Sequence, residues 1–516
     1  MSKTLGDLFA EFPLPILRGI PGLTRINRIV ADSRLVEPGD LFVATKGESF
    51  NAHKFIPDVI RKGAVAVVGS DPEIDPGVPY ILVPNSRQAL AYLSAAYYDY
   101  PARKLTIIGV TGTDGKTTTC NLLHQILVAS GIKTGMISTV SAVIGDDILD
   151  TGLHVTTPDS PDIQRLLSRM VNAGITHVVL ETTSHGWAQF RVDACEIDIG
   201  IVTNITHEHL DEHGSYENYR AAKARLFESL KETRPKIQGN PRLAVLNRDD
   251  RSFSYLSQIV SVNRRTYGFT PNADVHIQQV EYGPSGINFV VMGDGWQIPI
   301  ACPLIGAFNV SNCLAALTAA ICGLGIDPVV AASGIANFSG IPGRMERIDL
   351  GQNFTAIVDF AHTPNALKNA IETIRQIAKG RVIVIFGSAG LRDRQKRRMM
   401  AEISAQLADI SILTAEDPRT ESLEAILEEM AQGAISQGGK EGETFWRVPD
   451  RGDAIRLGLS LAAPEDVVMA CGKGHEQSMC FGETEYPWDD RTAMKAALAE
   501  SLGVVGPKMP FLPTQR

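Results

Sequence analysis

A glycine- and threonine-rich segment is the strongest sign of chemistry in this sequence. Residues 109–119 read Gly-Val-Thr-Gly-Thr-Asp-Gly-Lys-Thr-Thr-Thr, directly after an apolar run and before a helical pattern. The backbone amides of such a turn at a helix N-terminus bind phosphate. Lys116 would reach the β- and γ-phosphates of a nucleotide, and the Thr117 hydroxyl would bind Mg²⁺. The alternative is a turn without a ligand, because the spacing of its glycines is unusual: Gly109, Gly112 and Gly115.

Two further polar segments also follow strand patterns. Glu181 ends the run THVVLE and would hold a hard cation through its carboxylate, the alternative being a solvated loop acid. Residues 204–213 contain three histidines and three acids. They lack the His-Glu-x-x-His spacing of zinc proteases, so Mg²⁺ or Mn²⁺ beside phosphates is the favoured ligand. A polar helix start is the alternative.

The last third of the chain places four polar clusters after four apolar runs. The runs are 355–360, 381–387, 410–414 and 466–472, and the clusters are 359–364, 387–393, 416–419 and 472–476. The carboxyl ends of parallel strands meet in one crevice. Arg392, Arg419 and Glu476 could there clamp a zwitterion, since arginine matches a carboxylate and glutamate accepts from an ammonium. The alternative is that all four clusters are turns.

The elements that must position these residues form three blocks. Short strand patterns at 40–44 and 64–68 and a helical pattern at 87–98 mark a domain over 1–100. Alternating strands and helices then predict a central domain with a mostly parallel sheet over 101–339 and a Rossmann-like domain over 340–516. We expect antiparallel hairpins within 270–305, one helix over 309–323, and a partly loose tail after about residue 503. The predicted class is therefore α/β with three domains.

Composition limits the function further. The chain has 516 residues, 44% hydrophobic and 21% charged, and 49 basic against 58 acidic residues give a net charge of −9. Without a long basic run, nucleic-acid binding is not expected. No apolar run reaches the length of about 18 residues that spans a bilayer, and the N-terminus does not resemble a signal peptide. Seven cysteines without CxxC spacing favour a reducing compartment. We therefore expect a cytoplasmic monomer with neither nucleic-acid nor membrane partners.

In their order along the chain, the motifs resemble those of the Mur ligase family, and within it the branch that adds the third residue of the peptidoglycan stem peptide. The resemblance covers nearly the whole chain. Its motifs are Asp-Ser-Arg (32–34), Pro-Gly-Asp-Leu-Phe-Val (38–43), Thr-Gly-Thr-Asp-Gly-Lys-Thr-Thr (111–118), Thr-Thr-Pro (156–158), Glu-Thr-Thr-Ser-His (181–185), Asn-Ile-Thr-His-Glu-His-Leu-Asp (204–211), Gly-Ala-Phe-Asn-Val-Ser-Asn (306–312), Gly-Arg-Met-Glu (343–346), Asp-Phe-Ala-His-Thr-Pro (359–364) and Gly-Lys-Gly-His-Glu (472–476).

This resemblance implies domains that bind, in order, the UDP-sugar nucleotide, ATP and the incoming amino acid. It also implies the reaction. ATP, with Mg²⁺, phosphorylates the D-Glu γ-carboxylate of UDP-N-acetylmuramoyl-L-alanyl-D-glutamate, and the amine of a diamino acid attacks the acyl phosphate. A carboxylate becomes a good electrophile only after such activation, and phosphoryl transfer depends on positioning and charge neutralisation.

The resemblance also implies a role for each matching residue. Lys223, which its composition alone would make an exposed helix lysine, is implied to be carbamylated and catalytic. The catalytic set is Lys116, Glu181, His207 and Lys223, and the metal ligands are Thr117, Glu181, His207 and the carbamylated Lys223. ATP is bound by Gly112, Thr113, Asp114, Gly115, Lys116, Thr117, Thr118, Asn309, Arg344 and Asp359. The UDP-sugar dipeptide is bound by Ser33, Thr156, Thr157, Thr183, Gln189 and Arg191. The diamino acid is bound by Arg392, Glu416, Asp417, Pro418, Arg419, Gly472 and Glu476.

Departures from the family pattern leave the third substrate open. The motif Asp-Asn-Pro-Arg, associated with meso-diaminopimelate, reads Glu-Asp-Pro-Arg at 416–419. Arg419 could hold the distal carboxylate of diaminopimelate, which slightly favours that substrate. Asp417 adds an anion that would repel this carboxylate and favour L-lysine or L-ornithine. An acid of the family pattern is also lost at Leu391, and a hydroxyl at Phe360.

Two other functions remain as alternatives. A sibling ligase such as a folylpolyglutamate synthase would share the ATP motifs, but the clusters at 416–419 and 472–476 argue against it. A non-catalytic nucleotide-binding scaffold would have lost Lys116, Glu181, His207 or Lys223, and all four are present.

Overall fold

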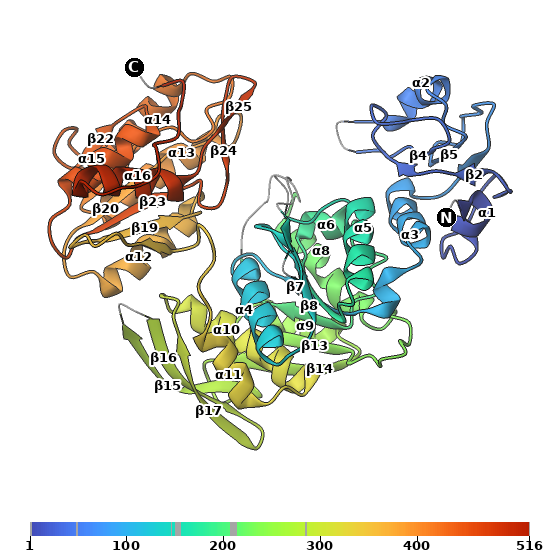
Figure 1. Ribbon diagram of the computed structural model, residues 1–516, viewed down its shortest axis with the longest axis horizontal. Helices are drawn as coiled ribbons and strands as arrows, with labels where there is room; N and C mark the ends of the chain where they lie inside the picture. The colour runs from blue at the N-terminus through green and yellow to red at the C-terminus, as the bar shows by residue number, and fades with distance from the viewer. Residues whose placement is uncertain are drawn as a thin grey trace. The chain divides into compact units, whose positions relative to one another are not determined.

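The structure is a computed structural model that describes residues 3–47, 50–145, 147–149, 156–206, 214–283 and 286–514 (Figure 1). The chain forms two compact units. The first comprises residues 1–279, 289–300 and 310–337, and the second comprises residues 280–288, 301–309 and 338–516. None of the helices in the described part of the chain is long and apolar enough to cross a membrane.

The N-terminal part of the first unit is built on a small parallel sheet of order β3-β4-β5-β6. The strands are Ile29–Val30, Leu41–Val43, Ala66–Gly69 and Tyr80–Leu82, and β1 (Lys3–Thr4) pairs with β2 (Arg25–Ile26) beside it. Helices α1 (Leu5–Phe9) and α3 (Ser86–Tyr97) pack on one face, while α2 (Ile56–Arg61), preceded by η1 (Ala52–Phe55), packs on the other. The strands and the helix predicted for this part are confirmed.

The rest of the first unit is organised around an 11-stranded sheet of order β10-β9-β8-β11-β7-β12-β13-β14-β15-β16-β17. The strands from β8 to β14 in this order are parallel. In sheet order they are Thr134–Ile137, His177–Glu181, Thr106–Thr111, Ile199–Val202, Leu243–Asn247 and Asn263–Gly268. The hairpin β9 (Ala142–Ile144) and β10 (Asp147–Leu149) extends one edge in antiparallel pairing. The predicted parallel central sheet is confirmed.

Successive residues of each central strand point to opposite faces, and each face is covered by helices. Ile107, Val178 and Ala244 pack in one core with the helices α5 (Ser160–Asn172), α8 (Tyr216–Ser229) and α9 (Phe253–Ile259). Helix α4 (Lys116–Ala129) contacts β7, β8 and β11, and packs against α11 (Pro328–Ala336) (Figure 1). The short helices η2 (Pro101–Lys104) and α6 (Ser184–Ala188) complete this part.

The other edge of the large sheet consists of β15 (Val275–Gly283), β16 (Gly286–Gly293) and β17 (Trp296–Cys302). Two residues separate β15 from β16 and β16 from β17, and connections of two residues join antiparallel strands, as predicted for 270–305. β15 itself runs parallel to β14. The single helix predicted over 309–323 is instead α10 (Phe308–Leu317) followed by a π-helical segment, η3 (Thr318–Gly323).

The second unit contains a six-stranded sheet of order β18-β19-β23-β20-β21-β22. Only β18 runs antiparallel to its neighbour. The strands in this order are Glu346–Ile348, Thr355–Asp359, Val467–Cys471, Val382–Phe386, Ile410–Leu413 and Phe445–Arg447. The four predicted strands of this block are confirmed, and together they give the predicted Rossmann-like sheet.

Helices cover both faces of this sheet. On one face lie α12 (Pro364–Ile377), α13 (Arg394–Leu407) and α14 (Leu423–Ser436), and on the other lie α15 (Arg451–Leu461) and α16 (Asp490–Leu502). A hairpin of β24 (Ser478–Phe481) and β25 (Thr484–Pro487) precedes α16. The tail after residue 503 lacks helix and strand in its described part, but it is not simply loose, because Leu512 is fully buried and the Thr514 hydroxyl donates to Asp450.

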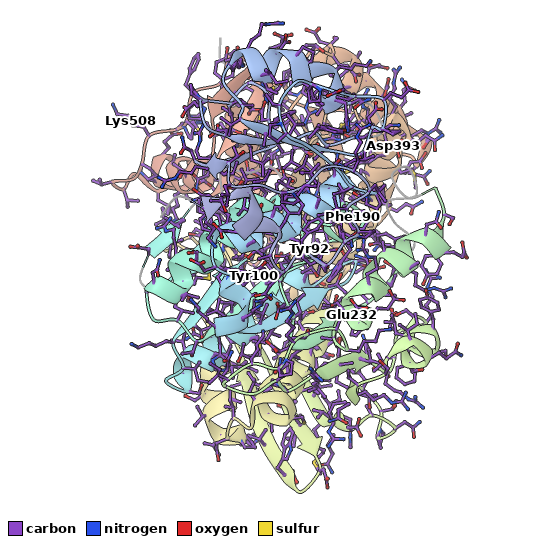
Figure 2. The ribbon with its side chains drawn as sticks, turned by 90° about the vertical axis from the view of Figure 1, so that its right-hand side faces the viewer. Tyr92, Tyr100, Phe190, Glu232, Asp393 and Lys508 are labelled. Atoms are coloured by element: carbon purple, nitrogen blue, oxygen red, sulfur yellow. The ribbon has the colours of Figure 1, made fainter. Side chains whose placement is uncertain are left out.

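A cavity of about 200 Å³ lies where the N-terminal sheet domain meets the central domain within the first unit. Tyr92, Tyr100 and Glu232 line it (Figure 2). Arg103 closes it with ion pairs of 3.0 Å to both Glu11 and Glu196. Burial raises the pKa of Tyr92 to about 12. This junction is thus held by polar contacts as well as by packing.

Candidate active site

The glycine-rich segment forms a tight connection between β7 and α4. Gly112 and Gly115 have φ values of +153° and +77°, which side-chain-bearing residues rarely adopt. A Cβ on Gly112 would collide with the Thr203 hydroxyl, and one on Gly115 with the side-chain oxygen of Asn312. Gly109, in contrast, lies within β7 against Ile197 and Leu226, so it serves packing and is not part of the loop.

Hydrogen bonds to Asn204 hold this loop in shape. The Asn204 carbonyl accepts from the Thr113 amide at 2.7 Å, and its side-chain oxygen accepts from the Asp114 amide at 3.0 Å. The Lys116 ammonium folds back and donates to the Thr113 carbonyl at 2.7 Å. Lys116, Thr117 and Thr118 begin α4, whose first amides have no partner within the helix and therefore suit an anion.

Glu181 connects this helix start to the neighbouring strand. The Glu181 side chain ends β11 and is 1% exposed. Its carboxylate accepts from the Thr117 hydroxyl at 3.0 Å, from the Thr139 hydroxyl at 2.9 Å and from the Thr139 amide at 3.0 Å. The predicted metal ligands Thr117 and Glu181 are thus adjacent oxygen donors. Thr139 is a member of this group that the sequence analysis missed.

Lys223 lies beside the same loop. Its side chain is 2% exposed, and its ammonium donates to the Gly112 carbonyl at 2.6 Å and lies 4.5 Å from the centre of the Tyr219 ring. The interpretation of Lys223 as an exposed helix lysine, based on composition alone, is therefore wrong. The Tyr219 hydroxyl in turn hydrogen-bonds the Thr113 hydroxyl at 3.0 Å, so α8 contacts the loop twice.

Four of the residues predicted to bind the dipeptide form a connected network. The Thr157 hydroxyl lies 3.1 Å from the Thr183 hydroxyl and 3.3 Å from the Glu181 carbonyl, to which it donates. Arg191 donates to the Thr157 carbonyl at 2.7 Å and to the Gln189 side-chain oxygen at 2.8 Å. The network is therefore connected to Glu181, which also contacts Thr117 at the start of α4.

Arg87 on α3 extends this network into the N-terminal domain. Its guanidinium donates to the Gln189 side-chain oxygen at 3.3 Å. Burial lowers the pKa of Arg87, although a guanidinium remains charged at neutral pH. Arg87 was not predicted, because a single arginine in a helical pattern gives no sign of a contact about one hundred residues away.

The structure also places the predicted residues Ser33, Asn309 and Thr156. Ser33 lies in the N-terminal domain, where its carbonyl accepts from the Lys62 ammonium at 2.8 Å. Asn309 is buried on α10 and donates to the Ile305 carbonyl at 2.8 Å. Thr156 is partly exposed next to Thr157. His207 lies outside the described residues.

In the second unit, Asp359 and Arg344 lie at the end of β19. The Asp359 carboxylate accepts from the Met345 amide at 2.7 Å and from the Ala361 amide at 2.8 Å. It therefore ties the segment around Arg344 to the strand. The Arg344 guanidinium stacks on the Phe360 ring at 4.3 Å from its centre.

Glu416 follows the end of β21 by three residues and lies in a closely packed, buried place. It is 5% exposed, and burial raises the pKa of its carboxyl above the usual range. Its Oε2 has no hydrogen-bond partner within the described residues. Gly472, with a φ of +115°, lies directly over it, because a Cβ there would collide with Oε2. The two loops that carry predicted diamino-acid ligands therefore touch.

Asp417 and Glu476 share a buried lysine that the sequence analysis did not single out. Lys473 is 2% exposed, and its ammonium lies 3.0 Å and 3.1 Å from the two Asp417 carboxylate oxygens. The Glu476 carboxylate lies 2.5 Å from the same ammonium. Burial lowers the pKa of Lys473, but Glu476 and Asp417 raise it more, so its pKa lies above the ordinary value. Asp417 is thus not an isolated anion.

Arg419 and Arg392 lie on two loops joined by backbone contacts. Gly390 packs against the Pro418 carbonyl, and its amide donates to the Asp417 carbonyl at 2.9 Å. Arg419 has a φ of +54° and pairs its backbone with the segment around Cys480. The Arg392 side chain is exposed. All four polar clusters predicted at strand ends therefore lie at one edge of the sheet.

A fully buried ion pair holds the backbone at this edge of the sheet. Arg451 donates to the carbonyls of Ala415 and Cys471 at 3.1 and 2.8 Å, and it pairs with Asp490 at 2.6 Å. Those two carbonyls belong to the residues just before Glu416 and Gly472. The Trp488 indole also donates to Asp490, at 2.8 Å.

In the described part of the chain, no group of three or more His, Cys, Asp or Glu side chains could hold a metal ion. The predicted ligand set, a threonine hydroxyl, a single glutamate, a modified lysine and His207, does not require such a group and stays a prediction. The hydroxyl and carboxylate oxygens of Thr117 and Glu181 are the kind of ligand that Mg²⁺ prefers.

Comparison with known proteins gives a consistent result. The Mur ligase family catalytic domain matches residues 25–98, the Mur ligase middle domain residues 110–320, and the Mur ligase glutamate ligase domain residues 343–474. A UDP-N-acetylmuramyl-tripeptide synthetase from a Roseiflexus species is 43% identical, over 92% of this chain and 95% of that protein.

Two further similarities cover comparable lengths. A UDP-N-acetylmuramoyl-L-alanyl-D-glutamate–2,6-diaminopimelate ligase from Geobacillus thermodenitrificans is 41% identical, over 91% of this chain and 94% of that protein. A solved structure of a ligase with the same name superposes with a TM-score of 0.67 at 29% identity, covering 97% of this chain and all of that chain. The similarity therefore extends over nearly the whole sequence.

Proposed function

Because this chain belongs to the Mur ligase family, we propose that it is the ATP-dependent ligase that joins meso-2,6-diaminopimelate to UDP-N-acetylmuramoyl-L-alanyl-D-glutamate. The observation that carries this proposal is the position of Glu181. Its carboxylate contacts the start of α4 through Thr117, and its carbonyl accepts from Thr157. A nucleotide phosphate and an acceptor carboxylate would thus meet at one residue.

The glycine-rich loop between β7 and α4 binds the nucleotide. The amides that begin α4 receive the phosphate oxygens, and Lys116 exchanges the Thr113 carbonyl for a phosphate oxygen. Thr117 and Glu181 would hold Mg²⁺, which neutralises the charge of the phosphates when bound.

Lys223 acts as a carboxylate after modification. Its unprotonated amine adds to carbon dioxide, which forms a carbamate and releases a proton. The burial of Lys223 beside Gly112 excludes water from this group and places its new oxygens next to the loop. In this proposal the carbamate and His207 complete the ligand set that Glu181 begins.

Thr157, Thr183, Gln189 and Arg191 position the acceptor. Their hydrogen-bond network offers hydroxyl, amide and guanidinium donors, which suit the carboxylates and carbonyls of a dipeptide. Transfer of the γ-phosphoryl group to the D-Glu γ-carboxylate gives an acyl phosphate. The free amine of the diamino acid then attacks the carbonyl carbon, and phosphate leaves as the amide forms.

Two observations favour diaminopimelate over lysine or ornithine as the third substrate. Relatives of 37 to 41% identity are diaminopimelate ligases by name. In addition, the charge of Asp417, which would repel a distal carboxylate, is paired with Lys473. Arg419 is then available for that carboxylate, as Arg392, Glu416, Gly472 and Glu476 are for the other polar groups of the substrate.

The remaining proposals concern the setting of the enzyme. ATP and Mg²⁺ are its cofactors, and it works as a cytoplasmic monomer in peptidoglycan precursor synthesis, which cell division and cell shape require. We keep 1–100, 101–339 and 340–516 as the limits of its three domains.

Trapping the acyl phosphate with hydroxylamine tests the proposed function. With ATP, Mg²⁺ and the UDP-sugar dipeptide but no diamino acid, the enzyme should form a hydroxamate. Glu181→Gln should reduce its yield at least about 100-fold, the loss typical of removing one transition-state stabilising group. Glu228→Gln, an exposed control on α8, should not. Equal hydroxamate from both variants would contradict the role of Glu181.

A further inference from the structure

The three candidate diamino acids differ at the end that does not react. Diaminopimelate carries both an ammonium and a carboxylate there, so this end has no net charge. Lysine and ornithine carry an ammonium alone, so the same end has a charge of +1. A pocket discriminates between the two kinds by its own charge, because like charges brought together and unpaired charges both reduce affinity.

Within the second unit, a compact charged cluster lies where the diamino acid is proposed to bind. The Lys473 ammonium lies between Asp417 and Glu476, at 3.0 Å and 2.5 Å. Asp417 receives a further hydrogen bond from the Cys480 amide at 2.9 Å. The side chains of Asp417 and Glu476 are 20% and 32% exposed, whereas that of Lys473 is 2% exposed. The two carboxylates therefore border the open side and the lysine lies beneath them.

The backbone fixes this arrangement. Asp417 has a φ of +42° and Gly472 a φ of +115°, so both loops hold unusual conformations next to the pair. Glu416, directly before Asp417, is 5% exposed, and its carboxylate lies against Gly472, so the two loops are packed together. Loss of the Lys473 charge would therefore change the electrostatic potential at the proposed diamino-acid site, and movement of the two loops would not simply compensate for it.

We propose that Lys473 is a specificity-determining residue that, by neutralising Asp417, makes this pocket select a diamino acid with a zwitterionic far end over one with a bare ammonium. This inference rests on the proposed function. Because the Lys473 ammonium contacts two carboxylates, it lowers the combined charge of Asp417 and Glu476 from −2 to −1. Arg419 then remains free to receive the distal carboxylate.

A purely structural role for Lys473 makes a different prediction. Loss of a structural ion pair would weaken the use of all diamino acids together. A role in specificity changes the ratio of kcat/KM for meso-diaminopimelate to kcat/KM for L-lysine. The ratio is therefore the readout, measured as product formed by the full chain with ATP, Mg²⁺ and the UDP-sugar dipeptide.

Three variants separate the charges. Lys473→Met removes the cation and should lower the ratio about 10- to 100-fold, the effect of one unit charge several ångströms away at an effective dielectric constant of about 20. Asp417→Asn removes the anion and should raise the ratio. The double variant restores the net charge and should return the ratio to within about threefold of the original. Lys379→Met, an exposed lysine that pairs with Glu465 in the same unit, serves as the control.

The outcomes distinguish the two claims. If the unmodified enzyme forms no product with any diamino acid, the proposed function fails and this inference fails with it. If the enzyme is active and the ratio stays constant in Lys473→Met and in Asp417→Asn, the proposed function stands and the specificity role is refuted. Should Lys473→Met not fold, Asp417→Asn decides alone: a raised ratio supports the inference, and an unchanged or lowered ratio overturns it.

Discussion

The buried pair of Arg451 and Asp490 allows a prediction that joins stability to substrate binding. Both side chains are fully buried, and Arg451 also donates to the carbonyls of Ala415 and Cys471. Replacing Arg451 with methionine keeps the approximate length of the side chain. It leaves the Asp490 carboxylate in the interior with only the Trp488 indole as a charge-stabilising donor among the side chains described here.

The size of the effect follows from these contacts. Removing one partner of a buried ion pair costs about 3 to 5 kcal/mol, because the other charge remains without compensation. Since about 1.4 kcal/mol corresponds to a factor of ten, amide hydrogens of β23 that exchange by opening of this domain should exchange roughly 10² to 4 × 10³ times faster. The KM for the diamino acid should also rise, because the carbonyls that Arg451 holds directly precede Glu416 and Gly472.

Native-state hydrogen exchange of the full chain is the suitable assay, since a protein with several domains has no single free energy of unfolding. Arg456→Met is the matched control, as Arg456 lies on the same helix α15 but pairs with Glu500 at the surface. Exposed pairs contribute about 0 to 1 kcal/mol, so this control should change exchange less than about tenfold. Similar exchange rates in the two variants would refute the account of the buried pair.

Three other outcomes are expected. Lys223→Ala should abolish ligation, and a short-chain carboxylic acid should restore part of it by occupying the place of the carbamate; no response at any concentration of acid would argue against carbamylation. Gly115→Ala should raise the KM for ATP at least tenfold, because the new Cβ would collide with the Asn312 side chain. Gly131 has the same φ of +77° but no such neighbour, so Gly131→Ala should reduce stability by about 1 kcal/mol and leave the KM for ATP unchanged. Equal KM values in the two variants would show that the contact with Asn312 is unimportant. Burial lowers the pKa of His475 to about 3, so the folded chain holds this imidazole neutral while the unfolded chain protonates it near pH 6.5. The contribution of neutral His475 to the free energy of unfolding is complete above pH 6.5 and is lost as the pH falls toward 3, by at most about 1.4 kcal/mol per pH unit. His475→Gln should therefore flatten the decline of thermal stability between pH 6.5 and 5.

The sequence predicted the strands that carry the site because their signals are local. Runs such as 105–110 and 381–387 are apolar enough to be buried on both faces, and polar residues follow each of them directly. In a parallel sheet such strand ends share one edge, so the polar clusters could be assigned to common sites. The exception was the helix expected over 309–323, since nothing in an alanine-rich pattern marks the change to a π-helical segment at Thr318.

The residues that were missed depend on contacts between distant parts of the chain. The buried Lys473 pairs with Asp417, 56 positions earlier, and the buried Arg451 pairs with Asp490, 39 positions later. A lysine or an arginine in a sequence is most often exposed, and only the fold shows that its partner lies beside it. The burial of Lys223 has the same cause, because the Gly112 carbonyl that receives its ammonium is 111 positions away.

The most direct test of the central claim is the ligation reaction itself. The full-length protein would be incubated with ATP, Mg²⁺, the UDP-sugar dipeptide and meso-diaminopimelate, and ADP, phosphate and the UDP-sugar tripeptide would be quantified together. The account predicts that the three products form in equal amounts and that omission of any substrate prevents tripeptide formation. ADP formation without a tripeptide, or a tripeptide with lysine or ornithine but not with diaminopimelate, would contradict it.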